Sequence, residues 1–319
     1  MIMLRMLGLG LVALVAATFS APTSTSAQNY PSQRVTIVVP FGAGSVTDIM
    51  ARIIAEEASK RWGQQVVVEN RPGLAGTTGV AKATPDGYTL MLTSNGHTVA
   101  GIVNKNLSFD PVKDFAGITR VCSAPLYLIV NPEVPAKNLK ELIDLAKAKP
   151  GALNFSSPGL ASTTFIAGAL FRKAAGINIV HVPFKSAPDA VTAVVRGDVQ
   201  MYFAPVNLSK EMAEAGKVRA IAAATPERIP DMPNVPTFKE AGLDFAYDSW
   251  FGLMAPAGVP RPVVEKINRD IVQILHSPEV KARLAAQFVI GVTDTPAQFD
   301  KIIRDETANL TEVLKQPTN

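Results

Sequence analysis

The sequence predicts an α/β protein built from two lobes. Short apolar strands alternate with helical segments along most of the chain, which favours parallel or mixed sheets covered by helices on both faces. The chain has 319 residues, of which 47% are hydrophobic, and no internal sequence repeat is visible. Two lobes fit this length better than one.

The clearest element is a strand that leads through a turn into a helix. Val35–Val39 is a continuous run rich in β-branched residues, as expected for a strand covered on both faces, and it ends at Pro40. Gly42–Gly44 forms a small-residue turn whose backbone amides can approach a ligand closely. Ser45 and Asp48 have the spacing of a capping box, in which the serine accepts from the Asp48 amide and the acid reaches back to the cap. The helix is therefore predicted to begin at about Ser45, and the turn is either an ordinary connection or an anion site.

The other elements are predicted from similar signals. Strands are predicted at Val66–Glu69, Tyr88–Thr93, Leu126–Val130, Ile179–Val182, Val199–Phe203, Ala220–Ala224 and Ser249–Ala255. Helices are predicted at Gly79–Ala83, Asn138–Lys149, Phe165–Ala175, Pro188–Arg196, Arg261–His276, Pro278–Gln287 and Pro296–Lys315. Turns are predicted at Ser94–His97 and Asn154–Ser156, and the proline-rich Thr225–Thr237 is expected to cover the surface.

The first 27 residues have the features of a secretory signal peptide. Arg5 precedes the apolar run Leu7–Phe19, which is too short to span a bilayer, and the small polar segment Ser20–Ala27 ends in an acceptable cleavage position. No later apolar run approaches the roughly 20 residues of a membrane span. We expect residues 1–27 to be removed and the product to be a soluble, exported protein that does not itself span a membrane.

Charge and cysteine content exclude several classes of partner and site. Beyond the leader the chain carries 30 basic and 27 acidic residues, and this small, scattered excess argues against nucleic acid as a partner. Cys122 is the only cysteine, so no internal disulfide can form, and a buried, inert thiol is expected. His97 and His181 have no paired histidine or carboxylate at metal-ligand spacing. Neither a metal nor a cofactor is therefore expected.

Two helix starts are the strongest candidates for binding a small anion. Gly44–Thr47 in the first lobe and Ser162–Thr164 in the second offer unsatisfied amides at the positive end of a helix dipole. The turn Ser94–His97 adds amide and imidazole groups, and Pro183–Lys185 adds a ring and a charge. The candidate ligand-binding residues are Phe41, Gly42, Ala43, Gly44, Ser45, Val46, Ser94, Asn95, His97, Ser157, Ser162, Thr163, Thr164, Phe184, Lys185 and Ala204.

Several of these candidates have a plain structural alternative. Ser45 can cap its own helix, in which case only its backbone amide faces a ligand. Asp48 is better explained as a capping carboxylate than as a general base. His97 and His181 fit surface or core positions, and Lys185 fits a solvated rim as well as a ligand contact.

The sequence does not favour an enzyme. The first turn lacks the Lys-Ser/Thr pair of a P-loop and the third glycine of a dinucleotide-binding fingerprint. No GxSxG motif is present, and neither His97 nor His181 has a visible serine or cysteine partner. A secreted hydrolase or transferase is the less favoured class, and no catalytic residue is assigned.

The chain also resembles the substrate-binding proteins of the tripartite tricarboxylate transporter family, called the Bug or TctC family. The resemblance covers essentially the whole mature chain and rests on short stretches that occur in the same order. They are Val38–Asp48, Val67–Gly73, Pro85–Leu90, Asp110–Phe115, Val130–Pro135, Lys147–Gly151, His181–Lys185, Ala215–Ala220 and Trp250–Gly258.

This resemblance implies a type II periplasmic binding protein, with two α/β lobes joined by two crossing strands and a ligand cleft between them. The crossings are expected near Arg120–Ala124 and Ser249–Gly252, so that residues 28–122 plus 250–319 form one lobe and residues 123–249 the other. Family members carry small organic anions to a two-component membrane permease, which is the implied partner of a monomeric receptor. A binding protein that serves a sensor fits the same sequence.

The chain departs from the family pattern at the candidate site. Its first turn reads Gly42-Ala43-Gly44-Ser45 in place of a proline and paired glycines. Phe165 stands near a position where histidine is frequent, and Ala204-Pro205 replaces an acid. These changes remove polar contacts, so we expect a ligand with little polar character beyond its carboxylate, such as an aliphatic or aromatic acid.

Overall fold

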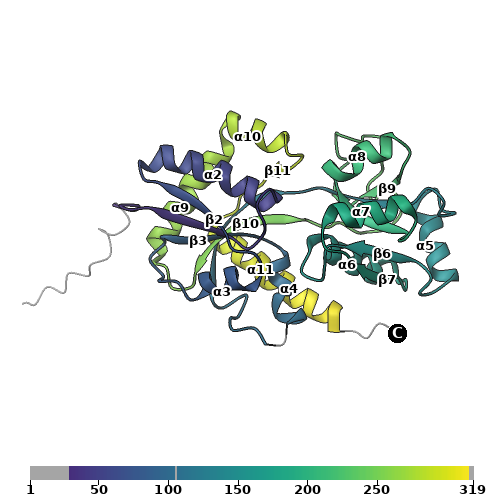
Figure 1. Ribbon diagram of the computed structural model, residues 1–319, viewed down its shortest axis with the longest axis horizontal. Coiled ribbons are helices and arrows are strands. Elements are labelled where there is room, and N and C mark those ends of the chain that lie inside the picture. The colour runs from purple at the N-terminus through teal and green to yellow at the C-terminus, as the bar shows by residue number, and fades with distance from the viewer. Residues whose placement is uncertain (1–28, 105, 316–319) are drawn as a thin grey trace, which may run out of the picture.

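The computed structural model describes residues 29–104 and 106–315, which form two α/β lobes that lie side by side along the longest axis of the molecule (Figure 1). The first lobe carries a six-stranded sheet and the second a five-stranded sheet. This is the two-lobed α/β architecture that the sequence predicts. The predicted signal peptide lies outside the described residues.

The first-lobe sheet has the order β11-β4-β10-β3-β1-β2. Its strands are β1 (Val35–Val39), β2 (Val66–Asn70), β3 (Thr89–Ser94), β4 (Phe115–Ser123), β10 (Trp250–Pro256) and β11 (Ile290–Gly291). Strands β2, β1 and β3 are parallel, whereas β10 runs antiparallel between β3 and β4. The sheet is therefore mixed, and its parallel half contains the strand that leads into the glycine turn.

Helices cover both faces of this sheet. They are α2 (Val46–Trp62), α3 (Leu74–Ala81), α4 (Gly96–Val103), α9 (Arg261–His276), α10 (Pro278–Ala285) and α11 (Pro296–Lys315). Along β1, Val35, Ile37 and Val39 belong to the apolar cluster that includes residues of α2 and α9, while Val38 belongs to the cluster that includes Phe299 of α11. Because strand side chains alternate between faces, a continuous apolar strand needs cover on both sides.

The second-lobe sheet has the order β7-β6-β8-β5-β9. Its strands are β5 (Leu126–Val130), β6 (Asn154–Ser157), β7 (Val180–Pro183), β8 (Met201–Pro205) and β9 (Arg219–Ala223). Its helices are α5 (Leu139–Ala148), α6 (Thr163–Ala175), α7 (Ala187–Arg196) and α8 (Val206–Glu214). Strands β6, β7 and β8 are parallel, and β5 is antiparallel to its neighbours β8 and β9.

Two chain segments cross between the lobes. The chain leaves the first sheet after Ser123 and enters the second at Leu126, and it returns to the first sheet at Trp250. The two segments are hydrogen-bonded to each other, because the Ala124 amide donates to the Ser249 carbonyl over 2.9 Å. Rotation of one lobe against the other would therefore bend both segments together.

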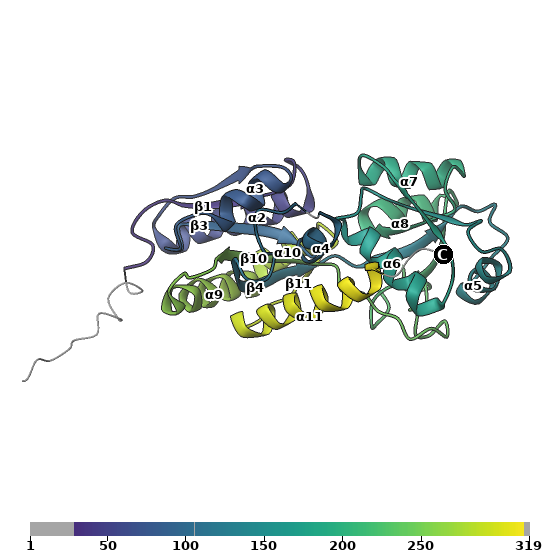
Figure 2. The same cartoon turned by 90° about the horizontal axis from the view of Figure 1, so that it is seen from below.

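The lobes also touch on either side of these crossings. Leu310 of α11 is fully buried in the second-lobe core together with Val99 of α4, and Figure 2 shows α11 reaching from the first lobe toward α6. Phe288, which has a left-handed backbone φ of 56°, packs against a second-lobe cluster and lies 6.0 Å below the Lys210 ammonium. The C-terminal region thus belongs to the first sheet but contacts both lobes.

The structure corrects four details of the predicted secondary structure. Asn154–Ser156 is not a turn but most of β6, which pairs with β7 on one side and β8 on the other. Helix α3 begins at Leu74, five residues before the predicted helix, and helices α4 and α8 were not predicted. Pairing and packing with distant segments override local turn propensity at such positions. Cys122 is fully buried, as expected, and burial raises the pKa of its thiol.

Candidate functional site

The candidate ligand-binding residues gather at one edge of each sheet. Those of the first lobe end or follow β1 and β3, and those of the second lobe end or follow β6, β7 and β8. Since β1 is parallel to β3, and β6 is parallel to β7 and β8, all of these residues lie at carboxyl ends of parallel strands. Ligands of open α/β sheets bind outside the carboxyl ends of the strands.

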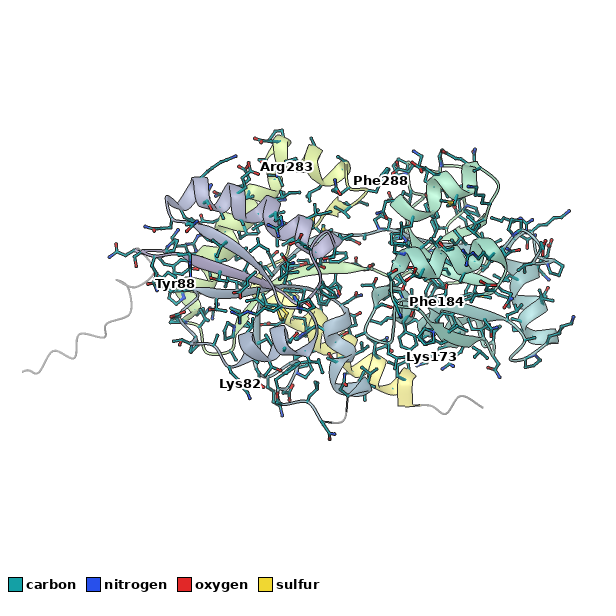
Figure 3. The ribbon with its side chains drawn as sticks, viewed as in Figure 1. Lys82, Tyr88, Lys173, Phe184, Arg283 and Phe288 are labelled. Atoms are coloured by element: carbon teal, nitrogen blue, oxygen red, sulfur yellow. The ribbon has the colours of Figure 1, made fainter. Side chains whose placement is uncertain are left out.

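The two edges meet at Gly96 and Ala161. Gly96 begins α4 directly after β3, and a Cβ atom at this position would lie 1.9 Å from the carbonyl oxygen of Ala161 in the loop after β6. Only glycine allows the two backbones to approach so closely. Phe184, which follows β7, lies on the side of the second lobe that faces the first (Figure 3). The carboxyl-end edges of the two sheets thus meet at the contact of Gly96 with Ala161.

In the first-lobe turn, Asp48 has a capping role. The Asp48 amide donates to Ser45 Oγ over 3.2 Å, and the Asp48 carboxylate accepts from the Gly44 amide over 2.9 Å. Burial opposes ionisation of Asp48, but hydrogen bonds from Arg52, Gly44 and Asn70 outweigh it and hold the pKa of this carboxyl below its usual value. The predicted cap is confirmed, with one correction: the acid reaches Gly44, one residue before Ser45, so the Gly44 amide is already occupied.

Other amides of this turn remain available. Within the described residues, no acceptor is hydrogen-bonded to the amides of Ala43, Val46 or Thr47, of which the last two are the first helical positions of α2. Gly42 and Ala43 are exposed, and Gly44 has a left-handed φ of 80° that shapes the turn. A helix N-terminus with free amides carries about half a positive charge. The turn can therefore bind an anion through its backbone.

The second-lobe turn repeats this arrangement with neutral groups. Ser162 Oγ accepts from the Phe165 amide over 3.1 Å and donates to the Gly159 carbonyl over 2.7 Å. Thr164 is buried, with its hydroxyl 3.3 Å from Ser162 Oγ. The amides of Thr163 and Thr164 donate to no acceptor in the described part of the chain. In both turns, the serine hydroxyl caps its helix and the first two helical amides have no acceptor among the described residues.

A serine–histidine pair in the second lobe was missed by the sequence analysis. Ser157 Oγ lies 2.7 Å from His181 Nε2, so the expectation that His181 has no serine partner was wrong. His181 also contacts the rings of Phe155 and Phe165, at 5.1 and 4.7 Å between centroids, and burial lowers its pKa to about 4. No described carboxylate is hydrogen-bonded to His181, so the pair lacks the third member of a catalytic triad. Only the pairing of β6 with β7 brings these residues together, and no local sequence signal could have shown it.

Three of the candidate side chains are buried. His97 is 4% exposed, its Nε2–H donates to the Pro111 carbonyl over 2.7 Å, and its ring packs edge-on against Phe115. Burial lowers the pKa of His97 to about 4. The side chains of Asn95 and Ala204 are fully buried. These three side chains pack inside the protein in this structure.

Asn95 instead joins a buried polar network at the crossing segments. Its amide nitrogen contacts the Tyr247 hydroxyl, the Asp248 carbonyl and Glu306 Oε1, the last two over 3.1 and 3.2 Å. Glu306 of α11 also accepts from Trp250 Nε1 over 2.7 Å, and burial raises the pKa of this carboxyl to about 8. Glu306 lies 211 residues from Asn95 in the chain, so sequence spacing gave no signal for it.

The remaining predicted residues line the same edges. Ser94 is buried at the end of β3, and Phe184 is half-buried, its amide donating to the Ser157 carbonyl over 2.8 Å. Lys185 is exposed and forms no ion pair with the described residues. The structure shows no group of three or more His, Cys, Asp or Glu side chains suited to a metal ion in residues 29–104 and 106–315. None of the helices described is both long and apolar enough to cross a membrane.

Comparison with known proteins identifies the family. The model of the tripartite tricarboxylate transporter family receptor, TctC, matches residues 50–318. The chain belongs to this family. BugT of Bordetella pertussis is a relative that is 33% identical over 314 residues, which cover 97% of this chain and 96% of BugT. The resemblance inferred from the short colinear stretches is therefore confirmed.

Solved structures of similar proteins support the same assignment. An R. palustris protein solved with adipate is 30% identical, with a TM-score of 0.76, and the match covers 90% of this chain and 97% of that one. MatC from Rhodopseudomonas palustris, solved with bound malate, is 31% identical, with a TM-score of 0.75 and coverage of 90% and 100%. The chain therefore has the fold of the solute-binding receptors of this family.

Proposed function

We propose that this receptor binds a small organic carboxylate in a cleft between its lobes, in the periplasm, and delivers it to a two-component permease of the tripartite tricarboxylate type. The observation that carries the proposal is the pair of capped helix starts at facing sheet edges. Each leaves two adjacent amides, Val46 and Thr47 on α2 and Thr163 and Thr164 on α6, without an acceptor among the described residues. Relatives solved with adipate and malate support a carboxylate as the ligand class.

The expected binding free energies are compatible with reversible binding of the ligand. An anion at a helix N-terminus gains roughly 0.3–1 kcal/mol at an exposed site and about 2 kcal/mol when partly buried. Micromolar affinity requires about 8 kcal/mol, which several amide hydrogen bonds and partial burial of the ligand can supply. A site built from amides, without an arginine clamp, suits a receptor that must also release its ligand.

The proposed division of the chain follows the two sheets. Residues 28–122 plus 250–319 would form the first lobe and residues 123–249 the second, with residues 1–27 removed on export. We assign no catalytic role to the Ser157–His181 pair, because its imidazole has no carboxylate partner among the described residues. Turnover of a bound acid or ester would contradict this assignment.

The proposal is tested by the ligand itself. Mass spectrometry of native protein should detect a co-purified organic acid, and titration with adipate and malate should change the fluorescence of Trp250, which is linked through Glu306 to Asn95 at the end of β3. The matched control is adipamide, which has the same carbon chain but no carboxylate. Binding of acids and not of the amide supports the proposal, whereas equal binding of adipamide, or no stabilisation by any carboxylate, overturns it.

Gene neighbourhood separates the transport role from signalling. Two adjacent genes for membrane subunits of a permease favour uptake. A sensor kinase in their place would favour a receptor that reports on its ligand.

A further inference from the structure

Four large apolar side chains are exposed among the described residues, and two of them lie beside the candidate site. Leu74 is 42% exposed, Leu160 is 46%, Val180 is 44% and Ile290 is 53%. Leu74 follows β2 and Leu160 follows β6, both at the carboxyl ends of parallel strands. Val180 instead begins β7, and Ile290 lies in the edge strand β11. Single exposed apolar residues are common, so the placement of this pair matters more than the exposure alone.

Leu74 is held in a fixed position beside the first-lobe turn. The Arg71 amide donates to the Val39 carbonyl over 2.9 Å, and the Gly73 amide donates to the Pro40 carbonyl over 3.0 Å. The Asn70 side chain also donates to the Phe41 carbonyl over 3.1 Å. The loop that carries Leu74 is thus hydrogen-bonded to the segment that enters the glycine turn.

Leu160 belongs to the second-lobe loop that touches the first lobe. Its neighbour Ala161 contacts Gly96 at the end of β3, and the Ser162 amide closes the loop by donating to the Gly159 carbonyl over 3.1 Å. In the first sheet, β1 lies between β3 and β2. Neighbouring strands are about 4.8 Å apart, so the ends of β3 and β2 are roughly 10 Å apart with the β1 turn between them. The loop of Leu74 thus follows the strand on one side of β1, and the loop of Leu160 contacts the end of the strand on the other side.

We propose that Leu74 and Leu160 form an apolar clamp on the hydrocarbon part of a carboxylate whose head group binds the helix-start amides. This inference rests on the proposed function and adds the class of substrate: acids with an aliphatic chain of about four or more carbons, or an aromatic ring, over small hydroxy acids. The amides would bind only the charged end of such an acid, and the leucines would contact its hydrocarbon part. An apolar chain gains free energy by covering two leucines that are otherwise exposed to water.

The test uses a series of straight-chain monocarboxylates from acetate to octanoate. In the parent protein, affinity should rise about fourfold for each added methylene over the middle of the series, which is the usual gain from burying one CH₂ group. In Leu74→Ser and Leu160→Ser the increment should fall below about twofold, so that hexanoate binds roughly tenfold more weakly while acetate changes by less than about twofold. Titration calorimetry or competition against the co-purified ligand supplies the affinities.

Val180→Ser is the matched control, since it removes an equally exposed apolar side chain at the amino end of β7, the end opposite the candidate site. It should keep the parent's chain-length dependence. An unchanged increment in both leucine variants, or an equal loss for acetate and hexanoate, overturns the clamp while leaving carboxylate binding intact. Failure of the folded parent protein to bind any carboxylate overturns the proposed function, and the clamp with it.

Discussion

The two helix starts at the junction between the lobes differ in the charge of the groups that cap them. The first turn of α2 contains Asp48, which pairs with Arg52 over 3.0 Å, whereas the first turn of α6 contains no acidic residue and is capped by the Ser162 hydroxyl. A carboxylate at a helix N-terminus offsets part of the positive end of the dipole. The comparison indicates that the second-lobe start attracts an anion more strongly, while the first-lobe turn contributes mainly the shape of the backbone.

The same difference recurs in the buried groups beside each turn. In the first lobe, Asn95 bonds to the carboxyl group of Glu306, with Asp248 and its partner Arg120 nearby. In the second lobe, Ser157 bonds to the imidazole of His181. Burial raises the pKa of Glu306 to about 8 and lowers that of His181 to about 4, so both groups favour their neutral forms. The two lobes should therefore respond to pH in opposite directions.

Glu306→Gln should have the largest effect on stability. The folded pKa of Glu306 is raised to about 8 from an ordinary value of 4.5. The folded protein therefore keeps this proton to a higher pH than the unfolded chain does. The resulting stabilisation of the folded state is fully present below pH 4.5 and is lost as pH rises through 8. Between pH 5 and 9 the free energy of unfolding of the parent should fall by about 4 kcal/mol, a loss that the glutamine variant does not show. Urea unfolding of both proteins at pH 5, 7 and 9 measures this difference.

An exposed acid on the same helix provides the control for this effect. Glu312→Gln should keep the parent's pH dependence, because Glu312 is exposed. If the free energy of unfolding of the parent and of Glu306→Gln varied with pH in the same way, Glu306 would be ionised in the folded protein and the assignment would be wrong.

Gly44→Val tests whether the first-lobe turn acts through its shape. A β-branched side chain is strained at φ 80°, although no atom lies within 4 Å of the position that its Cβ would occupy. We expect the variant to lose about 1–2 kcal/mol of stability and to bind its carboxylate about 50-fold more weakly, which corresponds to roughly 2.3 kcal/mol. Titration calorimetry and thermal unfolding give the two quantities.

Gly216→Val is the control, because it introduces the same kind of backbone strain away from the site. Gly216 has a φ of 67°, and no atom lies within 4 Å of the position that its Cβ would occupy. It should lose stability but not affinity. Parent-like binding by Gly44→Val would remove the first-lobe turn from the site.

Thr163→Asp should make the second-lobe helix start resemble that of the first lobe. An acid at the first position of α6 stabilises the helix by about 0.5 kcal/mol and repels an anionic ligand from the same amides. We therefore expect a higher melting temperature together with about tenfold weaker binding, or roughly 1.4 kcal/mol. The neutral variant Thr163→Asn should change affinity by less than about twofold. Unchanged affinity in Thr163→Asp would contradict the view that α6 carries the main electrostatic attraction.

His181→Gln should have the smallest effect, confined to acid pH. Because burial lowers the folded pKa of His181 to about 4 from 6.5, the unfolded chain takes up a proton first as pH falls. The stability that depends on the neutral imidazole is present above pH 6.5 and is lost toward pH 4. His181 is partly exposed, so we expect a loss on the order of 1 kcal/mol in the parent that the glutamine variant lacks. Urea unfolding at pH 7, 5.5 and 4.5 measures this loss of stability. A variant that loses more stability at acid pH than the parent would contradict the assignment.

Much of the candidate site could be predicted from local sequence. Ser45 and Ser162 cap helices that begin at the next residue, and each cap involves an amide only three residues away, so the signal is complete within one helical turn. The continuous apolar run of β1 also indicated a strand covered on both faces, and the structure covers it on both. These features depend on neighbours in sequence.

The predictions failed where a residue's surroundings come from distant segments. Strand β6 exists because β7 and β8 pair with its two sides, although Asn154–Ser156 has local turn character. His97 was a candidate ligand-binding residue, and in the structure α4 and the segment around Pro111 enclose its ring. The exposure of a polar side chain is set by tertiary packing, which a local pattern does not record.

The sequence by itself determined where two capped helices begin and that the chain resembles the TctC family over essentially its whole mature length. Only the tertiary structure decided which groups remain for a ligand. The Ser157 hydroxyl is occupied by His181 and the Asn95 amide group by Glu306. The physical reason is range: a helix cap is satisfied within a few residues, whereas burial and long-range hydrogen bonds depend on how the two lobes pack around the crossing segments.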